Sequence, residues 1–223
     1  MAKAKGTGLF MVWADVPADK EHDFNRWYNE EHLAELMAVP GVLNAARYEA
    51  VQNGPKHLAC YELESSAVVD TDAFKRIRRE PTEWSRRAAP SVVATTYVRN
   101  IYEMIYPTTL SSEIESNTMA PALQIGRMDI PADIEADWNE WYSTVYVPNY
   151  EKVTGVIRGR RFQAVSGEPK YLTVYEFDHP EVSKGDEWAV QQNIDPRNEK
   201  MRRAMDHVPG SPSIWKKTFE LVG

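Results

Sequence analysis

The chain has 223 residues, enough for a buried hydrophobic core that needs neither disulfides nor metals. Its single cysteine excludes an intrachain disulfide and a multi-cysteine zinc site, and its net charge of −7 disfavours nucleic acid as a partner, because nucleic-acid-binding proteins normally show a basic face. No apolar run near the N-terminus has the length of a signal peptide or a membrane span, so we expect a cytoplasmic protein with no membrane partner.

The sequence contains an internal repeat, which becomes visible when it is shifted by 114 residues. From Asp15 to Leu63 no gap is needed, and 20 of the 49 aligned positions are identical, far more than chance would give. We therefore predict two copies of one unit, over residues 1–106 and 122–223. An exposed linker rich in Thr, Ser, Glu and Pro is expected between them, at residues 107–121.

Each copy shows the same order of predicted elements. The first copy is expected to have strands at 9–14, 42–50, 57–63 and 92–104, with helices at about 19–38 and 72–87. The second copy is expected to have strands at 123–128, 156–164, 171–177 and 214–222, with helices at about 133–152 and 187–205. Gly41 and Gly155 end the first helix of each copy, since glycine tolerates a left-handed backbone. The order is βαββαβ, that of the ferredoxin-like unit.

A single ferredoxin-like unit leaves one face of its antiparallel sheet bare, because both of its helices pack on the other face. Two tandem units can cover these bare faces by pairing their sheets into one closed barrel of eight strands, with the helices outside. A barrel of this size has room for its own side chains and one small ligand. We therefore expect an α+β fold, built as an α/β barrel from two ferredoxin-like repeats, with a small-molecule pocket inside the barrel.

The first helix of each copy carries an apolar or aromatic stripe at every fourth position. The stripe consists of Phe24, Tyr28, His32 and Leu36 in the first copy and of Trp138, Tyr142, Tyr146 and Tyr150 in the second. His32 therefore adds an ionisable group where the second copy has Tyr146. Imidazole titrates near neutral pH, so His32 is a candidate general acid or base, oriented by Glu31 or Tyr28. The alternative is a neutral histidine that fills core space.

The third strand of each copy alternates between two kinds of side chain. His57 and Tyr61 share one face in the first copy, as Tyr175 does in the second, whereas Leu58 and Cys60 lie on the opposite face. We expect the His/Tyr face to point into the barrel, where phenol and imidazole groups could bind a ligand together with Tyr146. The alternative is that this face is an exposed, uncovered sheet surface.

The first strand adds two further candidates, because Trp13 aligns with Arg127 across the repeat. If this face points inward, Trp13 would stack on a ring and Arg127 would bind a carboxylate or enolate. No cluster of His, Cys, Asp and Glu has metal-ligand spacing, and the sequence has no glycine-rich phosphate loop and no nucleophile elbow. We therefore expect no metal and no cofactor, and a small molecule as the partner.

Three segments of the first copy carry a resemblance to a known family. They are Phe24 to Leu33 (FNRWYNEEHL), Val39 to Val42 (VPGV) and Arg47-Tyr48. Here the chain resembles the dimeric α/β-barrel superfamily, in particular its EthD-like members, and the resemblance covers most of both repeats. That superfamily includes muconolactone isomerases, polyketide cyclases, cofactor-free monooxygenases and haem-binding enzymes. The resemblance implies proton transfer by His32, and Tyr146 at the same place of the second copy departs from the pattern. Most relatives pair two chains, whereas this chain is expected to be paired within itself.

These observations lead to one main hypothesis and two alternatives. The main hypothesis is a cofactor-independent lyase, isomerase or cyclase that acts on a small aromatic or polyketide-like compound and uses His32 for proton transfer. The first alternative is an oxygenase of the same fold, which uses O₂ directly or haem. The second is a non-catalytic accessory protein that binds small molecules. Association of two barrels into a homodimer is left open.

Overall fold

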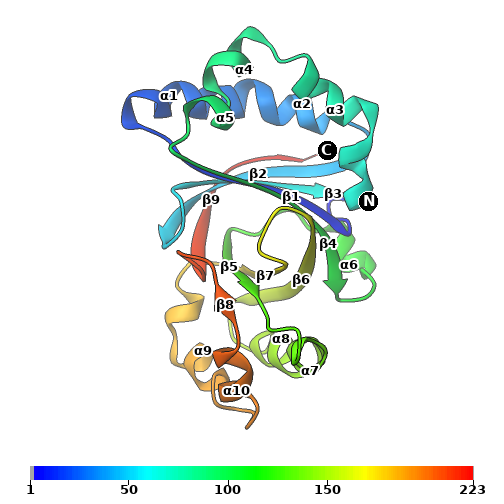
Figure 1. Ribbon diagram of the computed structural model, residues 1–223, viewed down its shortest axis with the longest axis vertical. Helices are drawn as coiled ribbons and strands as arrows, with labels where there is room; N and C mark the ends of the chain where they lie inside the picture. The colour runs from blue at the N-terminus through cyan, green and yellow to red at the C-terminus, as the bar shows by residue number, and fades with distance from the viewer. Residues whose placement is uncertain (1–2, 223) are drawn as a thin grey trace.

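Eight strands of the computed structural model, which describes residues 3–222, close into an antiparallel barrel (Figure 1). The barrel strands are β1 (Gly8–Asp15), β2 (Val42–Gln52), β3 (His57–Leu63), β4 (Thr96–Tyr106), β5 (Ala122–Asp129), β6 (Val156–Ser166), β7 (Tyr171–Phe177) and β9 (Ser213–Val222). Their order is β7-β6-β4-β1-β3-β2-β9-β5, and β5 pairs with β7 to close the ring. The short β8 (Asp206–His207) pairs with the end of β5. The predicted α+β class and closed barrel are confirmed.

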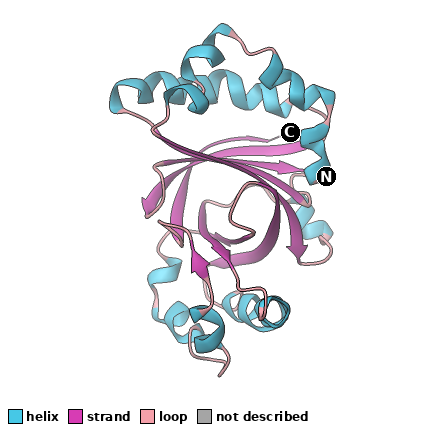
Figure 2. Ribbon diagram, viewed as in Figure 1, coloured by secondary structure: helices cyan, strands magenta, loops and turns pink. Residues whose placement is uncertain are grey.

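The helices form two outer layers, one on each side of the barrel (Figure 2). The first layer holds α1 (Ala18–Trp27), α2 (Leu33–Met37), α3 (Asp72–Arg79), α4 (Glu83–Ala88) and α5 (Pro90–Val93). The opposite layer holds α7 (Glu135–Trp141), α8 (Val147–Tyr150), α9 (Asp186–Gln191) and α10 (Asn198–Arg203). Short 3₁₀ helices span Ser66–Asp70 and Val182–Lys184. No described helix has both the length and the apolar character that crossing a membrane would require.

Both faces of the sheet are buried, so each strand divides its side chains between two cores. From β1, Leu9, Met11 and Trp13 enter the core inside the barrel, whereas Phe10 and Val12 enter the core under the first helical layer. The same division on β3 sends Leu58 and Cys60 inward and Ala59 and Tyr61 toward the helices. The expectation that the His/Tyr face of the third strand points into the barrel is therefore wrong.

Side chains from both halves fill the barrel interior. Bulky members of this core include Met11, Trp13, Tyr48, Tyr102, Phe162 and Trp215. Met119 and Ala120 also belong to it, being only 3% and 4% exposed. Residues 107–118 of the expected linker are exposed or half-buried and contain α6 (Ser112–Ser116). The end of the segment differs from an exposed linker, because Met119 and Ala120 are buried and the hydroxyl of Tyr48 donates a hydrogen bond to the carbonyl of Ala120 over 3.0 Å.

A buried ionic network joins the two halves beside this interior core. Arg160 of β6 donates to both carboxylate oxygens of Glu62 on β3 and lies 3.0 Å from Glu176 on β7. Lys5 lies 3.5 Å from Glu62 and 3.3 Å from Glu176, and Arg158 lies 3.4 Å from Glu176. Burial by itself would raise the pKa of Glu176, but the cations Lys5, Arg160 and Arg158 together hold this pKa below its usual value.

The first helix of each half is interrupted by one π-helical turn. These turns span Tyr28–His32 between α1 and α2 and Tyr142–Tyr146 between α7 and α8. In such a turn the hydrogen bonds run from residue i+5 to residue i, as from the amide of Leu33 to the carbonyl of Tyr28. Side chains five positions apart are thereby brought together, and the rings of Trp27 and His32 stack with centroids 4.3 Å apart.

The second predicted helix of each half is broken into short pieces. In the first half α3 ends before Pro81, α4 starts after Thr82, and Pro90 opens α5. Thr82 accepts a hydrogen bond from the amide of Ser85, which is an N-terminal cap that starts a new helix. The expectation of one continuous helix at about 72–87 is wrong. Pro81 cannot continue the hydrogen bonding of α3, and the cap at Thr82 begins a new helix. These short helices form one wall of the cavity described next.

Candidate functional site

The larger described cavity lies outside the barrel, between strands β1 and β4 and the first helical layer. Its volume is about 1080 Å³. Its mainly apolar walls come from β1, β4, the π-helical turn and α3 to α5, with Phe10, Tyr28, Leu36, Phe74, Ile77 and Ile101 among the lining residues. This location corrects the expectation of a pocket inside the barrel. The sheet face that a ligand could touch is the one under the helices, because the other face is filled by the interior core.

His32 lines this cavity from the π-helical turn. Its ring stacks on Trp27 with an interplanar angle of 17° and meets the ring of Tyr28 edge-on at 5.5 Å. The Nδ1 atom lies 3.2 Å from Oε2 of Glu35, and Nε2 makes no hydrogen bond among the described residues. A carboxylate on one ring nitrogen fixes the orientation and tautomer of a histidine, which leaves the other nitrogen available to exchange a proton.

Glu31 and Tyr28, the residues expected to orient His32, have different contacts. Glu31 accepts hydrogen bonds from Thr82 Oγ1 (2.6 Å) and from Trp27 Nε1 (3.2 Å), so it ties the first helix to α4. Burial raises the pKa of the Tyr28 phenol, which keeps it protonated at neutral pH. The carboxylate that meets His32 is that of Glu35, which the sequence analysis missed; its position three residues after His32 on one helix was the available signal.

A group of cationic side chains, which we call the basic rim, lines part of the cavity. It consists of Lys75, Arg78, Arg79, Arg86 and Arg99. None of the described residues that line the cavity is acidic. Arg99 of β4 lies over the ring of Phe10, with 4.7 Å between the guanidinium carbon and the ring centroid, and burial lowers its pKa. The guanidinium of Arg99 has no hydrogen bond or ion pair within the described chain, so it is free to bind an anion.

The other predicted binding residues lie elsewhere. Trp13 is buried in the barrel interior, and the guanidinium of Arg127 stacks on its ring at 4.4 Å and donates to the carbonyl of Glu168 at 2.7 Å. Both side chains face inward, as expected from the sequence, but they stack on each other instead of contacting a ligand. Tyr61 lies beside Phe10, its cross-strand neighbour on the same face of the sheet, with ring centroids 5.2 Å apart, and it does not line the cavity.

Tyr146 and Tyr175 line a smaller cavity in the second half, of about 300 Å³. The ring of Tyr146 lies 4.6 Å from that of Trp141 but is tilted by 44°, unlike the stacked pair of His32 and Trp27, and its hydroxyl lies 3.4 Å from that of Tyr150. Burial and the neighbouring Tyr150 raise the pKa of Tyr146. Tyrosine and tryptophan rings thus fill in the second half much of the space that stays open in the first, and no histidine occupies the equivalent position.

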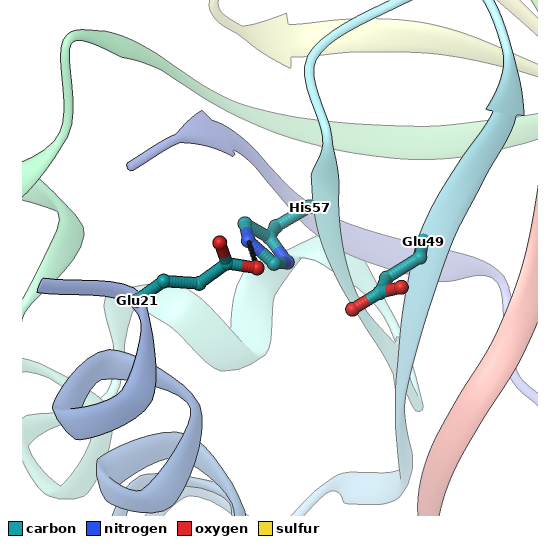
Figure 3. Close-up of side chains that lie close together, drawn as sticks. All are labelled: Glu21, Glu49 and His57. Carbon is teal, nitrogen blue, oxygen red and sulfur yellow. Dashed lines mark ion pairs between the residues drawn. The ribbon is translucent and has the colours of Figure 1, made fainter. Parts of the chain in front are cut away.

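His57 lies apart from both cavities, at the start of β3. It is 2% exposed and its Nε2 is 3.3 Å from Oε1 of Glu21 at the beginning of α1. In the view of Figure 3 its ring lies between Glu21 and Glu49, the latter on β2. Burial, followed by the nearby charge of Arg47, lowers the pKa of His57. The site residues predicted from sequence therefore separate into several groups, of which only His32 and Tyr28 line the larger cavity.

No protein-family model matches the sequence, and no curated protein sequence matches it. Solved structures do show the same fold at low sequence identity. An anthrone oxidase-like protein has 11% identity and a TM-score of 0.66, over 99% of this chain and 95% of that one. A candidate monooxygenase of Fusobacterium nucleatum has 10% identity and a TM-score of 0.61, over 97% and 95%. A haem-binding protein of Thermus thermophilus has 11% identity and a TM-score of 0.57, over 96% and 92%. The chain therefore has the dimeric α+β barrel fold.

Proposed function

We propose that the first-half cavity binds a small, acidic aromatic compound and that the protein oxygenates it with O₂. The single observation that carries this proposal is the position of His32, whose ring lines an apolar cavity while Glu35 holds its Nδ1. A base held in this way can remove a proton from an activated carbon or a phenol of the bound compound. Arg99 lies on the same cavity and would stabilise the negative charge that forms.

The reaction can balance without an added reductant. His32 removes a proton from a methylene that neighbouring rings or a carbonyl activate, and the resulting carbanion transfers electrons to O₂ and forms a carbon–oxygen bond. The peroxide that results takes a proton, loses its second hydrogen from the same carbon and breaks its oxygen–oxygen bond. The products are a ketone and one molecule of water. The methylene carbon supplies all four electrons, so O₂ is the sole oxidant.

The names of structural neighbours support this oxygenase over the lyase or isomerase that the sequence analysis favoured. An anthrone oxidase-like protein and a candidate monooxygenase share the fold over nearly the whole chain. The lyase or isomerase uses the same histidine for the same proton transfer, but it needs no O₂. Dependence of turnover on O₂ therefore separates the two functions.

Haem is a second candidate, favoured by one observation. The Nδ1 of His32 is held by Glu35 and its Nε2 has no partner in the described chain, the arrangement that a ligating histidine adopts. In donor type the residues fit the group: His32 would supply a nitrogen ligand and the basic rim would pair with the propionates. Bound haem would supply one-electron and O₂ chemistry. Titration with hemin, read from the absorbance of bound haem, tests this candidate in wild type and His32→Gln.

The test of the main proposal uses anthrone as a probe and an oxygen electrode. The wild-type protein is expected to consume one O₂ for each anthraquinone formed, and His32→Gln is expected to lose at least about 100-fold of this turnover. His179→Gln is the control, because His179 is 56% exposed and does not line the cavity. Anaerobic conversion of the probe would favour the lyase or isomerase. Equal turnover by a folded His32→Gln variant would remove His32 from the mechanism.

We also propose that residues 1–106 and 122–223 are two copies of a ferredoxin-like unit of the EthD-like type. The supporting observation is the strand order, which is β4-β1-β3-β2 in the first half and β9-β5-β7-β6 in the second. One copy would then carry the reaction and the other would complete the barrel.

A small-molecule carrier without catalysis stays the alternative if ligands bind and no probe turns over. Cytoplasmic location and homodimer formation stay predictions.

A further inference from the structure

Glu21, Glu49 and His57 form a cluster that the proposed reaction does not use. One ligand atom of each residue lies within 4.8 Å of the other two. The three residues come from different elements, α1, β2 and β3, and none of them lines either cavity. Figure 3 shows the two carboxylates on opposite sides of the imidazole. A modest side-chain rotation would let the three groups share one ion.

The imidazole of His57 is the unusual member of this cluster. The residue is 2% exposed, and neither Nδ1 nor Nε2 has a hydrogen-bond partner of good geometry in the described chain. Buried polar atoms are normally satisfied, so such a group calls for an explanation such as an ion. Its Nε2 lies 3.3 Å from Oε1 of Glu21, an ionic contact that lacks hydrogen-bond geometry.

The second half shows what the same place looks like without such a cluster. The equivalent residues are Glu135, Gln163 and Tyr171. There the hydroxyl of Tyr171 donates a hydrogen bond to Glu135 over 2.9 Å and accepts one from Asn139 over 2.9 Å, so this polar group has its hydrogen-bond partners. The first half replaces that phenol by an imidazole and the neutral amide by a second carboxylate, and both replacements add metal-ligand character.

A metal ion would compete with a lysine for these carboxylates. Lys56 makes an ion pair with Oε1 of Glu21, and Lys170 and Glu135 form the equivalent pair in the second half. Lys56 is 51% exposed, so its ammonium can swing into solvent when another cation arrives. The guanidinium of Arg47 points instead toward the rings of Phe24 and Tyr28. Glu49 has no ion pair in the described chain and its carboxylate is available.

We propose that Glu21, Glu49 and His57 bind a divalent transition-metal ion of the zinc class, which displaces Lys56. One imidazole and two carboxylates are ligands that such ions accept, and water would complete a four-coordinate site. The ion would link the start of α1 to the β2–β3 hairpin through its ligands. The site is separate from His32, so its failure leaves the oxygenase proposal untouched.

The test is calorimetric titration of the full chain with Zn²⁺, together with thermal unfolding at increasing Zn²⁺. The wild type is expected to bind one equivalent through this site. Two variants copy residues that the second half already uses at these places, His57→Tyr and Glu49→Gln, and each is expected to weaken this binding at least about tenfold. Lys56→Met is expected to tighten it, because the competing ammonium is gone. His179→Gln is the control for surface histidines and is expected to leave it unchanged.

Two results would overturn the site. One is absence of Zn²⁺ binding by the wild type, and the other is full-affinity binding by either folded variant, with circular dichroism confirming the fold. Glu49→Gln keeps the test decisive even if His57→Tyr fails to fold, because Glu49 is half-buried and its replacement has nearly the same shape. Loss of binding in both variants together with unchanged binding by His179→Gln supports the site.

Discussion

Replacement of Arg160 by Met tests the buried network that joins the two halves. Arg160 is 2% exposed, and it holds Glu62, which is fully buried, through two hydrogen bonds. In Arg160→Met, the nearest remaining cation to Glu62 is Lys5 at 3.5 Å, which also serves Glu176. Glu62 is then left buried with Lys5 as its remaining cationic partner.

The expected loss follows from the cost of a stranded buried charge. Removing one partner of a buried ion pair typically destabilises a protein by about 3–5 kcal/mol. For a chain of about 150–250 residues each kcal/mol lowers Tm by about 2–4 °C, so Tm should fall by about 6–20 °C. Because Lys5 still contacts Glu62 on β3 and Glu176 on β7 in this variant, the barrel should still unfold as one unit.

The assay is urea unfolding followed by tryptophan fluorescence and circular dichroism, with a double variant as the internal control. Glu62→Gln combined with Arg160→Met removes both charges and should recover at least half of the lost stability. Arg203→Met, which breaks a pair with Glu199 whose side chains are 78% and 73% exposed, should change stability very little. A loss below about 1 kcal/mol in Arg160→Met, or no recovery in the double variant, would refute the reasoning.

Three further predictions concern the cavities. Arg99→Leu should weaken the binding of an aromatic carboxylate such as 1-hydroxy-2-naphthoate by about 10- to 100-fold, and should weaken the binding of 1-naphthol much less. Fluorescence titration measures both affinities, and equal losses for the two ligands would argue against charge recognition by Arg99. Glu35→Gln should lower turnover about 10- to 100-fold with little change in KM, because His32 loses its orienting carboxylate, and an unchanged pH–rate profile would count against this role. Burial lowers the pKa of His207, so below about pH 6.5 this histidine binds a proton more readily in the unfolded chain than in the folded one. The free energy of unfolding should therefore rise with pH up to about 6.5, and His207→Gln should flatten that rise in urea unfolding.

Two features of the site were accessible from sequence because they depend on local patterns. The repeat and the change from His32 to Tyr146 are visible by alignment alone, and the aromatic stripe marked the correct helix. Glu35 was missed, although its spacing from His32 is a normal helical contact. The π-helical turn that stacks His32 on Trp27 leaves no such signal, because the residues five positions apart meet only after the helix widens.

Which face of each strand points into the barrel could be learned only from the tertiary structure. Alternation along β1 and β3 showed two different faces, and that much the sequence determined by itself. In this barrel both faces are buried, one in the interior and one under helices, so hydrophobicity carries no information on which is which. The cavity likewise depends on where α3 to α5 lie over the sheet. Arg99 was not singled out from sequence, because only their placement turns a strand arginine into part of a cavity wall.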